Sequence, residues 1–344
     1  MNKPSQRATL ADIAERAGVS ASSVSRVLNN KMPMSDHVRA QVLAAAESLG
    51  YEPKRREARE ANVGVIALII TETVNPYFHE IVQGAQDEAE RTNLFSVVVN
   101  STPNEEHKHI MVQTLSALPL CGVILCAGQL ASDSLIDFYE QSRVPLVVIN
   151  RRVARANVPC IVIDYENALL RATQHLLSLG HTRIAYLAGP SAVETSQLRR
   201  RGIELALAAQ GLSLHPEFCP ASLPNVTGGF QAMSNLLHLA EAERPTAVIA
   251  YNDLVAIGAL NAVRAAGLRV PEDISVIGCD DIPMATYTNP PLTTVSIPKY
   301  QIGKLAVQTL CQVRAKQAAP GGYTQIEGSL IVRDSTAAVV GTVK

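Results

Sequence analysis

The stretch ADIAERAGVSASSVSRVLNN, residues 11–30, holds two short helical patterns joined by a single glycine. Thr9 and Asp12 have the spacing of a capping box, which predicts that a helix begins directly after Thr9. Gly18 is placed to end this helix, and Ser20 is placed to cap a second one. The two patterns therefore predict a pair of short helices separated by a tight turn.

A third helical pattern follows, beginning at Ser35 or Asp36 and stopping at Gly50. In all three segments apolar residues recur three or four positions apart, which predicts one buried face for each helix. These residues are Leu10, Ile13, Ala14, Ala17, Val24, Val27, Leu28, Val38, Val42, Ala45, Ala46 and Leu49, with Val19 as an apolar plug in the turn. The start of the chain is therefore expected to form a compact all-α unit.

The outward face of the second helix is small, and it consists of Ala21, Ser22, Ser25 and Arg26. Two helices joined by a short glycine turn, with a third in support, predict a helix-turn-helix, whose second helix enters the major groove of DNA. Small side chains let such a helix approach the bases closely, and Arg26 can donate two hydrogen bonds to guanine. Thr9 and Asn29 are candidate contacts to phosphates or to the groove edge. From spacing alone, a small helical bundle with an ordinary polar surface is the alternative.

At 344 residues the chain exceeds the usual size of a single hydrophobic core, so we expect at least two folding units. Hydrophobic residues make up 47% of it, which is normal for a globular protein, and no apolar run is long enough to cross a bilayer. With no leader pattern at its start, the chain is expected to be cytoplasmic and without a membrane partner. Six cysteines without a C-x-x-C pair predict reduced core thiols, and neither a metal nor a cofactor is expected.

The net charge of −1 hides an asymmetry along the chain. Residues 1–62 contain ten Lys or Arg against seven Asp or Glu, whereas the remainder contains 20 against 24. The basic residues of the first part end in a cluster of Lys54, Arg55, Arg56 and Arg59. Such a cluster can contact DNA phosphates, although on its own it is also typical of a solvated linker.

From Val63 onward, strand-length apolar runs alternate with helical patterns. The predicted strands cover residues 63–70, 95–100, 122–126, 145–150, 160–163, 183–187, 247–250 and 275–278, and the predicted helices cover 78–92, 166–179, 197–210, 254–266 and 299–315. Continuous Val, Ile and Leu runs between helices predict an α/β core of two doubly wound lobes, whose parallel sheets are covered on both faces. The first lobe is expected to hold residues 63–160 and 292–322, and the second 161–291 and 323–344.

Polar residues gather where the predicted strands end, at 75–78, 150–152, Asp164, 251–253 and 279–281. In doubly wound sheets, ligands bind beyond the carboxyl ends of the strands. Aromatic rings can stack on the apolar face of a sugar, while carboxylates, amides and arginine pair with its hydroxyls. The set therefore predicts a site for a small polyhydroxylated ligand, although each motif taken singly is also typical of a helix cap.

The segment TLADIAERAGVSASSVSRVLNN, residues 9–30, together with AAAESLGYEP, residues 44–53, resembles the headpiece of the lactose-repressor/galactose-repressor family of bacterial regulators. The resemblance implies a DNA-binding headpiece over residues 1–53. Ser23 stands where the family usually has threonine and keeps the hydroxyl. The candidate DNA-binding residues are Thr9, Ser20, Ala21, Ser22, Ser23, Ser25, Arg26, Asn29, Lys54, Arg55 and Arg56, of which Ala21, Ser22 and Arg26 match the positions that read operator bases.

The linker KRREAREAN, residues 54–62, departs from the family pattern. It is several residues shorter than the family's hinge, which becomes helical on DNA and inserts a leucine into the minor groove. Glu60 lies near the position of that leucine, and an acidic side chain cannot act as an apolar wedge between base pairs. Either the basic residues of the linker contact phosphates without kinking the duplex, or the hinge uses another register.

Three later segments resemble the regulatory core that this family shares with the periplasmic sugar-binding proteins: RPTAVIAYNDLVAIGAL (244–260), GLRVPEDISVIGCDDI (267–282) and NPPLTTVSIPKYQIGKLA (289–306). By position, the resemblance implies effector contacts at Asn75, Tyr77, Phe78, Asn150, Arg151, Asp164, Arg199, Asn252 and Asp253. Asn150 replaces the usual aspartate. Leu223 falls near a position where several relatives stack an aromatic residue, so one ring that faces the ligand is expected to be missing.

Together, the motifs and the resemblance predict an effector-responsive, DNA-binding transcription regulator. We expect a repressor of a carbohydrate-utilisation operon that binds a palindromic double-stranded DNA operator as a homodimer, and a sugar or sugar derivative between its lobes. No G-x-S-x-G elbow, Walker loop or H-E-x-x-H motif is found, so an enzyme is not expected. Two alternatives stay open: a sugar-binding receptor with weak or vestigial DNA binding, and a regulator whose co-effector is a nucleobase or a partner protein.

Overall fold

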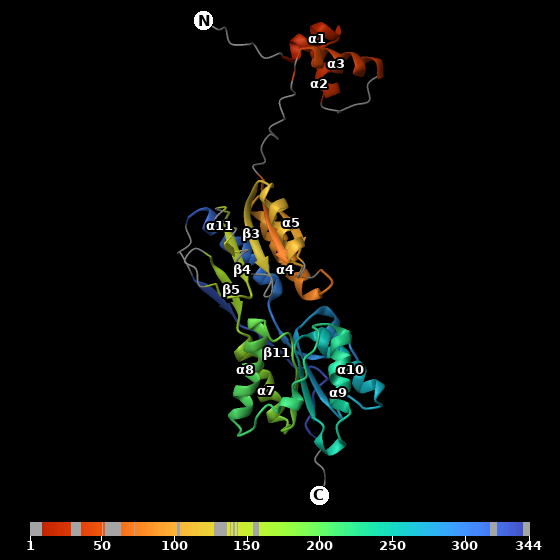
Figure 1. The fold of residues 1–344 in the computed structure, drawn as a ribbon, viewed down its shortest axis with the longest axis vertical. Coiled ribbons are helices and arrows are strands. Elements are labelled where there is room, and N and C mark those ends of the chain that lie inside the picture. The colour runs from red at the N-terminus through yellow and green to blue at the C-terminus, as the bar shows by residue number, and fades with distance from the viewer. Residues whose placement is uncertain are drawn as a thin grey trace. The chain divides into compact units, whose positions relative to one another are not determined.

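The computed structural model describes residues 9–28, 36–49, 51, 63–71, 73–101, 104–126, 136, 137, 139, 142, 144–153, 158–316 and 322–339. The chain divides into two compact units, residues 1–63 and 64–344, and each is described by itself (Figure 1). In the described parts of both units, no helix combines the length and the apolar character needed to cross a lipid bilayer.

The first unit is built from three helices, α1 (Leu10–Ala17), α2 (Ala21–Leu28) and α3 (Asp36–Ser48). Their apolar faces meet in one small core. The residues buried or partly buried there are Leu10, Ile13, Ala14, Ala17, Val19, Val24, Val27, Val38, Val42, Ala45, Ala46, Leu49 and Tyr51. The predicted inward faces are thereby confirmed, except for that of Leu28, whose side chain lies outside the described part of the structure.

Local hydrogen bonds set the ends of the first two helices. The Thr9 N–H donates to Asp12 Oδ2 at 2.7 Å and the Asp12 N–H donates to Thr9 Oγ1 at 3.3 Å, which is the predicted capping box. Gly18 has a φ of +66°, a left-handed conformation that glycine adopts without steric penalty, and α1 ends there. The Ser23 N–H then donates to Ser20 Oγ at 3.1 Å, so Ser20 caps α2 as expected.

The second unit contains two sheets, and the first has six parallel strands in the order β10-β5-β4-β3-β1-β2. These strands are β1 (Gly64–Ile70), β2 (Leu94–Asn100), β3 (Leu120–Cys126), β4 (Leu146–Ile149), β5 (Cys160–Ile163) and β10 (Tyr323–Ile326). The helices α4 (Pro76–Arg91), α5 (Glu105–Ser116) and α11 (Lys299–Arg314) pack on this sheet. We call this assembly the first lobe.

The second sheet has the order β11-β9-β8-β7-β6 and is parallel except for β11, which runs antiparallel to β9. Its strands are β6 (Ile184–Leu187), β7 (Ala247–Ala250), β8 (Ser275–Asp280), β9 (Thr293–Ser296) and β11 (Ser329–Ile331). Its helices are α7 (Tyr165–Ser178), α8 (Glu194–Ala208), α9 (Val226–Leu237) and α10 (Asp253–Ala265), with short 3-10 turns at Pro216–Phe218, Glu241–Glu243 and Pro283–Thr286. We call this assembly the second lobe.

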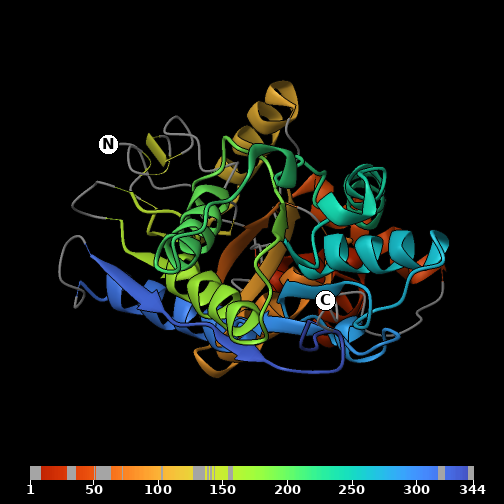
Figure 2. The ribbon, with the colours of Figure 1, turned by 90° about the horizontal axis from the view of Figure 1, so that it is seen from below.

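Both sheets are covered by helices on both faces, as their apolar runs predict. In β1, Ile66 and Leu68 share a core with α4 and α11, whereas Ala67 and Ile69 point into the core on the α5 side. In the second lobe, the pair α7 and α8 covers one face of the sheet and the pair α9 and α10 covers the other (Figures 1 and 2). The expected α/β core with two doubly wound lobes is confirmed.

The sheets divide the chain differently from the expected lobe boundaries at three strands. β5, most of which was assigned to the second lobe, lies in the first sheet, and so does β10. β9, assigned to the first lobe, lies in the second sheet beside β8. The chain therefore crosses between the lobes after β5, after β9 and after β10. Apolar runs predict that a strand exists, but its partner depends on tertiary pairing, and the short β10 is also largely exposed.

Candidate functional site

The predicted effector residues lie in the second unit, and all of them except Arg199 of α8 (Glu194–Ala208) follow the carboxyl ends of strands from the two sheets. Asn75 follows β1 and caps α4, because its side chain accepts a hydrogen bond from the Tyr77 N–H at 3.0 Å. Asn150 comes directly after β4. The Asn150 Nδ2 donates to the Tyr77 hydroxyl at 2.8 Å, and the rings of Tyr77 and Phe78 meet edge to face at 5.1 Å. The structure thus brings these four residues together on the first lobe.

The second lobe contributes a cluster around Arg199, a residue of α8 that is only 3% exposed. Its guanidinium carbon lies 3.5 Å from the ring centroid of Tyr165 and 4.5 Å from that of Tyr251. Its Nη1 donates to the Thr195 carbonyl at 3.1 Å, and its Nη2 lies 3.8 Å from Asp280 Oδ1. Arg199 is therefore sandwiched between two rings beside a buried carboxylate, which offsets part of the cost of burying its charge.

Burial shifts the pKa values of the ionisable side chains in this cluster. Burial raises the pKa of the Asp280 carboxyl to about 7, although the Arg199 guanidinium acts in the opposite direction. Burial likewise raises the pKa of the Tyr77 and Tyr165 hydroxyls, so both stay neutral at physiological pH. The cluster therefore offers one fixed cation, neutral hydroxyls and a carboxyl whose charge changes near neutrality.

Several buried polar atoms of this region have no hydrogen-bond partner among the described residues. They are Asn150 Oδ1, Arg199 Nε, Asp280 Oδ1 and the Tyr186 hydroxyl. A buried polar atom without a partner costs about 1 to 3 kcal/mol, so such atoms concentrate where a ligand can supply the missing bonds. Acceptors on Asn150 and Asp280 suit ligand hydroxyls, and the donor on Arg199 suits a ligand oxygen.

Asn252 and Asp253, two further predicted contacts, use their polar atoms within the protein. Asn252 caps α10, with its Oδ1 accepting from the Val255 N–H at 2.9 Å. Asp253 is fully buried, and its two oxygens accept from Thr294 Oγ1 at 2.5 Å and from the Ile282 N–H at 2.8 Å. Burial raises the pKa of Asp253 to about 6, against the lowering effect of both bonds. The contacts show a role in joining α10 to β8 and β9, and a ligand contact stays a prediction.

Asp164 and Arg151 lie near the same strand ends. Asp164 caps α7, and its carboxylate accepts from Asn167 and from Gln325 Nε2. Burial raises the pKa of Asp164, but these hydrogen bonds together lower it below its usual value. A small pocket joins the end of β4 to the start of α8 across the two lobes, and it is lined by Asn150, Arg151, Arg152, Val162, Ile163, Glu194, Thr195 and Leu198.

The sequence placed Tyr251 and Asp280 in the polar runs that predict the site, but not among the named effector contacts, and it gave no indication of Tyr165. Tyr251 and Asp280 belong to the polar runs that follow β7 and end β8, so their position carried a signal, although nothing in it distinguished them from helix caps. Tyr165 is the first residue of α7, and only the packing of α7 against α8 places its ring on Arg199. Leu223, where an aromatic ring was expected to be missing, is 62% exposed.

The predicted DNA-binding residues lie in the first unit. Ala21 is exposed on α2, and the hydroxyls of Ser20 and Ser23 are 2.9 Å apart. The Thr9 hydroxyl donates to Asp12 Oδ2 at 2.7 Å. The side chains of Ser22, Ser25 and Arg26, and the whole of Asn29, Lys54, Arg55 and Arg56, lie outside the described part of the structure.

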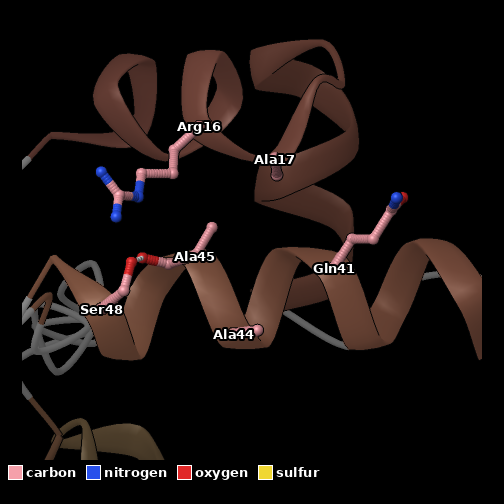
Figure 3. A pocket seen from close by; sticks show the side chains of 6 residues that line it. All are labelled: Arg16, Ala17, Gln41, Ala44, Ala45 and Ser48. Atoms are coloured by element: carbon pink, nitrogen blue, oxygen red, sulfur yellow. Dashed lines mark hydrogen bonds between the residues drawn. The ribbon is translucent and has the colours of Figure 1, made fainter.

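A shallow pocket of the same unit lies between α1 and α3 rather than on α2 (Figure 3). Its lining is Arg16, Ala17, Gln41, Ala44, Ala45 and Ser48. In Figure 3, Arg16 and Ser48 lie toward one end of the pocket and Gln41 toward the other, with Ala44 and Ala45 between them on α3. It contains none of the predicted DNA contacts, so the helix-turn-helix assignment does not depend on it.

Comparison with known proteins gives matches over both units. Residues 9–54 match the lacI family of bacterial regulatory proteins, and residues 173–336 match the periplasmic binding protein-like domain. The chain is 36% identical over 343 residues to the HTH-type transcriptional regulator MalR of Streptomyces coelicolor, covering 96% of this chain and 97% of that protein.

Two solved structures cover the chain almost completely. The lac repressor dimer bound to operator and the anti-inducer ONPF has a TM-score of 0.73 at 29% identity, covering 97% of this chain and 100% of that one. The complex of the transcriptional regulator CelR with cellobiose has a TM-score of 0.72 at 29% identity, covering 96% and 100%.

Proposed function

Because this chain belongs to the lacI family of bacterial transcription regulators, we propose that it represses a carbohydrate-utilisation operon by binding a palindromic operator as a homodimer, under the control of a small effector. It is a DNA-binding transcription regulator and not an enzyme. Among its relatives, the lac repressor binds operator as a dimer, and CelR forms a complex with cellobiose.

The first unit supports the DNA-binding half of the proposal. A capped α1, a left-handed glycine and a capped α2 form a helix-turn-helix whose second helix can enter a major groove. Two such helices reach successive major-groove faces when they lie about 34 Å apart, which requires two copies of the chain. Ala21, Ser22 and Arg26 are proposed to read the bases, and the basic residues of the linker to contact phosphates.

Exposed apolar side chains support the second copy. On the first lobe, Phe95 of the edge strand β2 is 62% exposed, and Ile110 of α5 is 52% exposed. On the second lobe, Leu223, Phe230, Met284 and Tyr287 are exposed on or beside α9 and the turn Pro283–Thr286. Apolar surface of this kind on both lobes is expected of a dimer that pairs each lobe with its counterpart.

The main support for effector binding is the packing of the Tyr165 and Tyr251 rings on Arg199, beside Asp280. It combines rings, a buried cation and acceptors without hydrogen-bond partners near the strand ends where doubly wound sheets bind ligands. A molecule with vicinal hydroxyls and an apolar ring face satisfies these groups, so a sugar or sugar derivative is the proposed effector. Asn150 offers both a donor and an acceptor, which also suits a nucleobase as the second candidate.

Two measurements test the proposal. DNA that the purified chain selects from random duplexes should contain a palindrome and should shift in a gel assay at low salt; absence of any binding would favour a receptor without DNA function. A thermal-shift screen of sugars, sugar acids, nucleosides and purines, followed by calorimetry, should identify the effector, because a bound ligand raises the apparent stability. Stabilisation by purines alone would replace the sugar proposal with the nucleobase one.

A further inference from the structure

Lys299 is a buried lysine at the point where the chain crosses from the second lobe to the first. It is the first residue of α11 and follows β9 by three positions. The side chain is only 2% exposed, which is unusual for lysine unless its charge is paired. Neither the proposed DNA contacts nor the proposed effector contacts account for it.

The ammonium of Lys299 has a partner for each of its three donors. Nζ donates to the carbonyl oxygens of Asp280 and Asp281, and it lies 3.3 Å from Glu80 Oε1 on α4. An ammonium has three donors and no acceptor, so the three partners saturate it. Two of them, the last residue of β8 and the residue after it, belong to the second lobe, and the third belongs to the first lobe.

The two carbonyls belong to a strained stretch of backbone. Asp280 has a φ of +117° and Asp281 a φ of +53°, both in the left-handed region that residues other than glycine rarely adopt. Such conformations persist where surrounding contacts hold them in place. Here the contacts are Lys299 on the carbonyls and Arg333, whose Nη2 donates to Asp281 Oδ1 at 2.7 Å. This backbone presents the Asp280 carboxylate to Arg199.

On the first lobe, the partner of Lys299 is part of a rigid helix pair. α4 and α11 touch backbone to backbone, since a Cβ on Gly84 would lie 2.0 Å from the Tyr300 carbonyl oxygen. Glu80 lies on α4 three residues after Tyr77, whose hydroxyl accepts a hydrogen bond from Asn150 at the end of β4. A shift of Lys299 is therefore transmitted to both helices, and through α4 to Tyr77 and Phe78, the proposed effector contacts at its start.

We propose that Lys299 is a positioning residue whose ammonium, oriented by Glu80, holds the backbone of Asp280 and Asp281 and so couples the α4–α11 pair to the carboxylate that faces Arg199. The inference rests on the proposed effector cleft. It adds a route by which a ligand between Asp280 and Tyr77 moves the first lobe. That lobe begins at Gly64, directly after the linker from the DNA-binding unit.

Hydrogen exchange on the effector-free, full-length chain tests the coupling without DNA or ligand. Lys299→Met keeps an unbranched side chain, one atom shorter, but removes all three donors, and exchange should become about tenfold faster or more around residues 280–286 and in the first turns of α4 and α11. Glu80→Gln should give a smaller change at the same places, and it replaces Lys299→Met if that variant does not fold. Lys304→Met on α11 is the control, because Lys304 makes no hydrogen bond or ion pair among the described residues, and it should exchange like the wild type.

Operator affinity gives a readout that a merely structural role would leave unchanged. On a selected duplex, Lys299→Met or Glu80→Gln should change the effector-free affinity at least about fivefold, with Lys304→Met unchanged. Acceleration of exchange over the whole core, or wild-type operator affinity in both variants, would overturn the proposal. If the wild-type chain bound no duplex at all, the proposed function would fail while the exchange result still decided the role of Lys299.

Discussion

Asp253→Asn is expected to gain stability over the wild type as the pH rises. The Asp253 carboxylate accepts two hydrogen bonds, from Thr294 and from the Ile282 N–H, inside a fully buried environment. Burial raises its pKa from 3.8 to about 6, because desolvation of the charged form outweighs both bonds. For a carboxyl whose folded pKa is raised, the stabilising contribution is fully present below the unfolded pKa and is lost as the pH rises through the folded pKa.

The magnitude follows from these two pKa values. They differ by about two pKa units, and each unit corresponds to about 1.4 kcal/mol, so ionisation lowers the free energy of unfolding by about 3 kcal/mol once the pH is well above 6. About a third of this loss is already present near pH 4.5, because the Asp253 carboxyl ionises in the unfolded chain at a lower pH than in the folded one, and this ionisation favours the unfolded chain. Asparagine has the same shape and no charge, so the stability of the variant relative to the wild type should rise by about 2 kcal/mol between about pH 4.5 and pH 8.

Urea denaturation followed by far-UV circular dichroism measures this difference, because the chain has no tryptophan for fluorescence. Asp334→Asn is the matched control: Asp334 is exposed, and substitutions at exposed positions usually change stability by about 0.5 kcal/mol or less. A variant of Asp253 that becomes less stable relative to the wild type on going to pH 8 would refute the reasoning, because the hydrogen bonds would then outweigh burial and the pKa would be lowered.

Three further outcomes are expected. Arg26→Ala should abolish operator selectivity in gel shifts while calorimetry shows unchanged effector binding, and equal losses in both would argue against an independent DNA reader. Tyr251→Ala should weaken effector binding about tenfold, because it removes one of the rings that pack on Arg199, and an aromatic ring on a desolvated cation contributes about 1 to 2 kcal/mol. Tyr251→Phe keeps the ring and should bind the effector about as well as the wild type. If the Phe variant bound as weakly as the Ala variant, the hydroxyl and not the ring would be responsible. Burial lowers the pKa of His181, whose ring nitrogens bond Thr246 and the Ala337 carbonyl, so its stabilising contribution should fade as the pH drops below about 6.5. The unfolding free energy of His181→Gln should then vary less with pH than that of the wild type in this range, and an unchanged slope would mean that His181 binds its proton equally well in the folded and unfolded chain.

Much of the fold could be predicted because its signals are local. The capping box of Thr9 and Asp12 and the left-handed Gly18 act over three or four residues, so the sequence alone placed α1 and α2. In the core, apolar runs predicted β1 to β8, because a strand that lies in a covered sheet needs apolar residues along most of its length. β10 carried no such signal, since its residues are mostly exposed.

Pairing and site geometry depended on contacts between distant parts of the chain. β9 lies beside β8 and β10 beside β5, and no pattern within either strand specifies its partner, which is why the expected lobe boundaries were wrong there. The rings on Arg199 come from the start of α7 and the end of β7, which only the packing of the second lobe brings together.

The sequence by itself determined that this protein has a capped helix-turn-helix, a parallel α/β core and polar residues at the strand ends. Only the tertiary structure decided which of those residues are available to a ligand. The side-chain oxygens of Asp253 accept hydrogen bonds from Thr294 and Ile282, and that of Asn252 accepts one from Val255. Asn150 and Asp280, in contrast, each have a buried oxygen without a hydrogen-bond partner. The physical reason is that a side chain's type sets how many hydrogen bonds it can make, while the partners that use them come from other strands and helices.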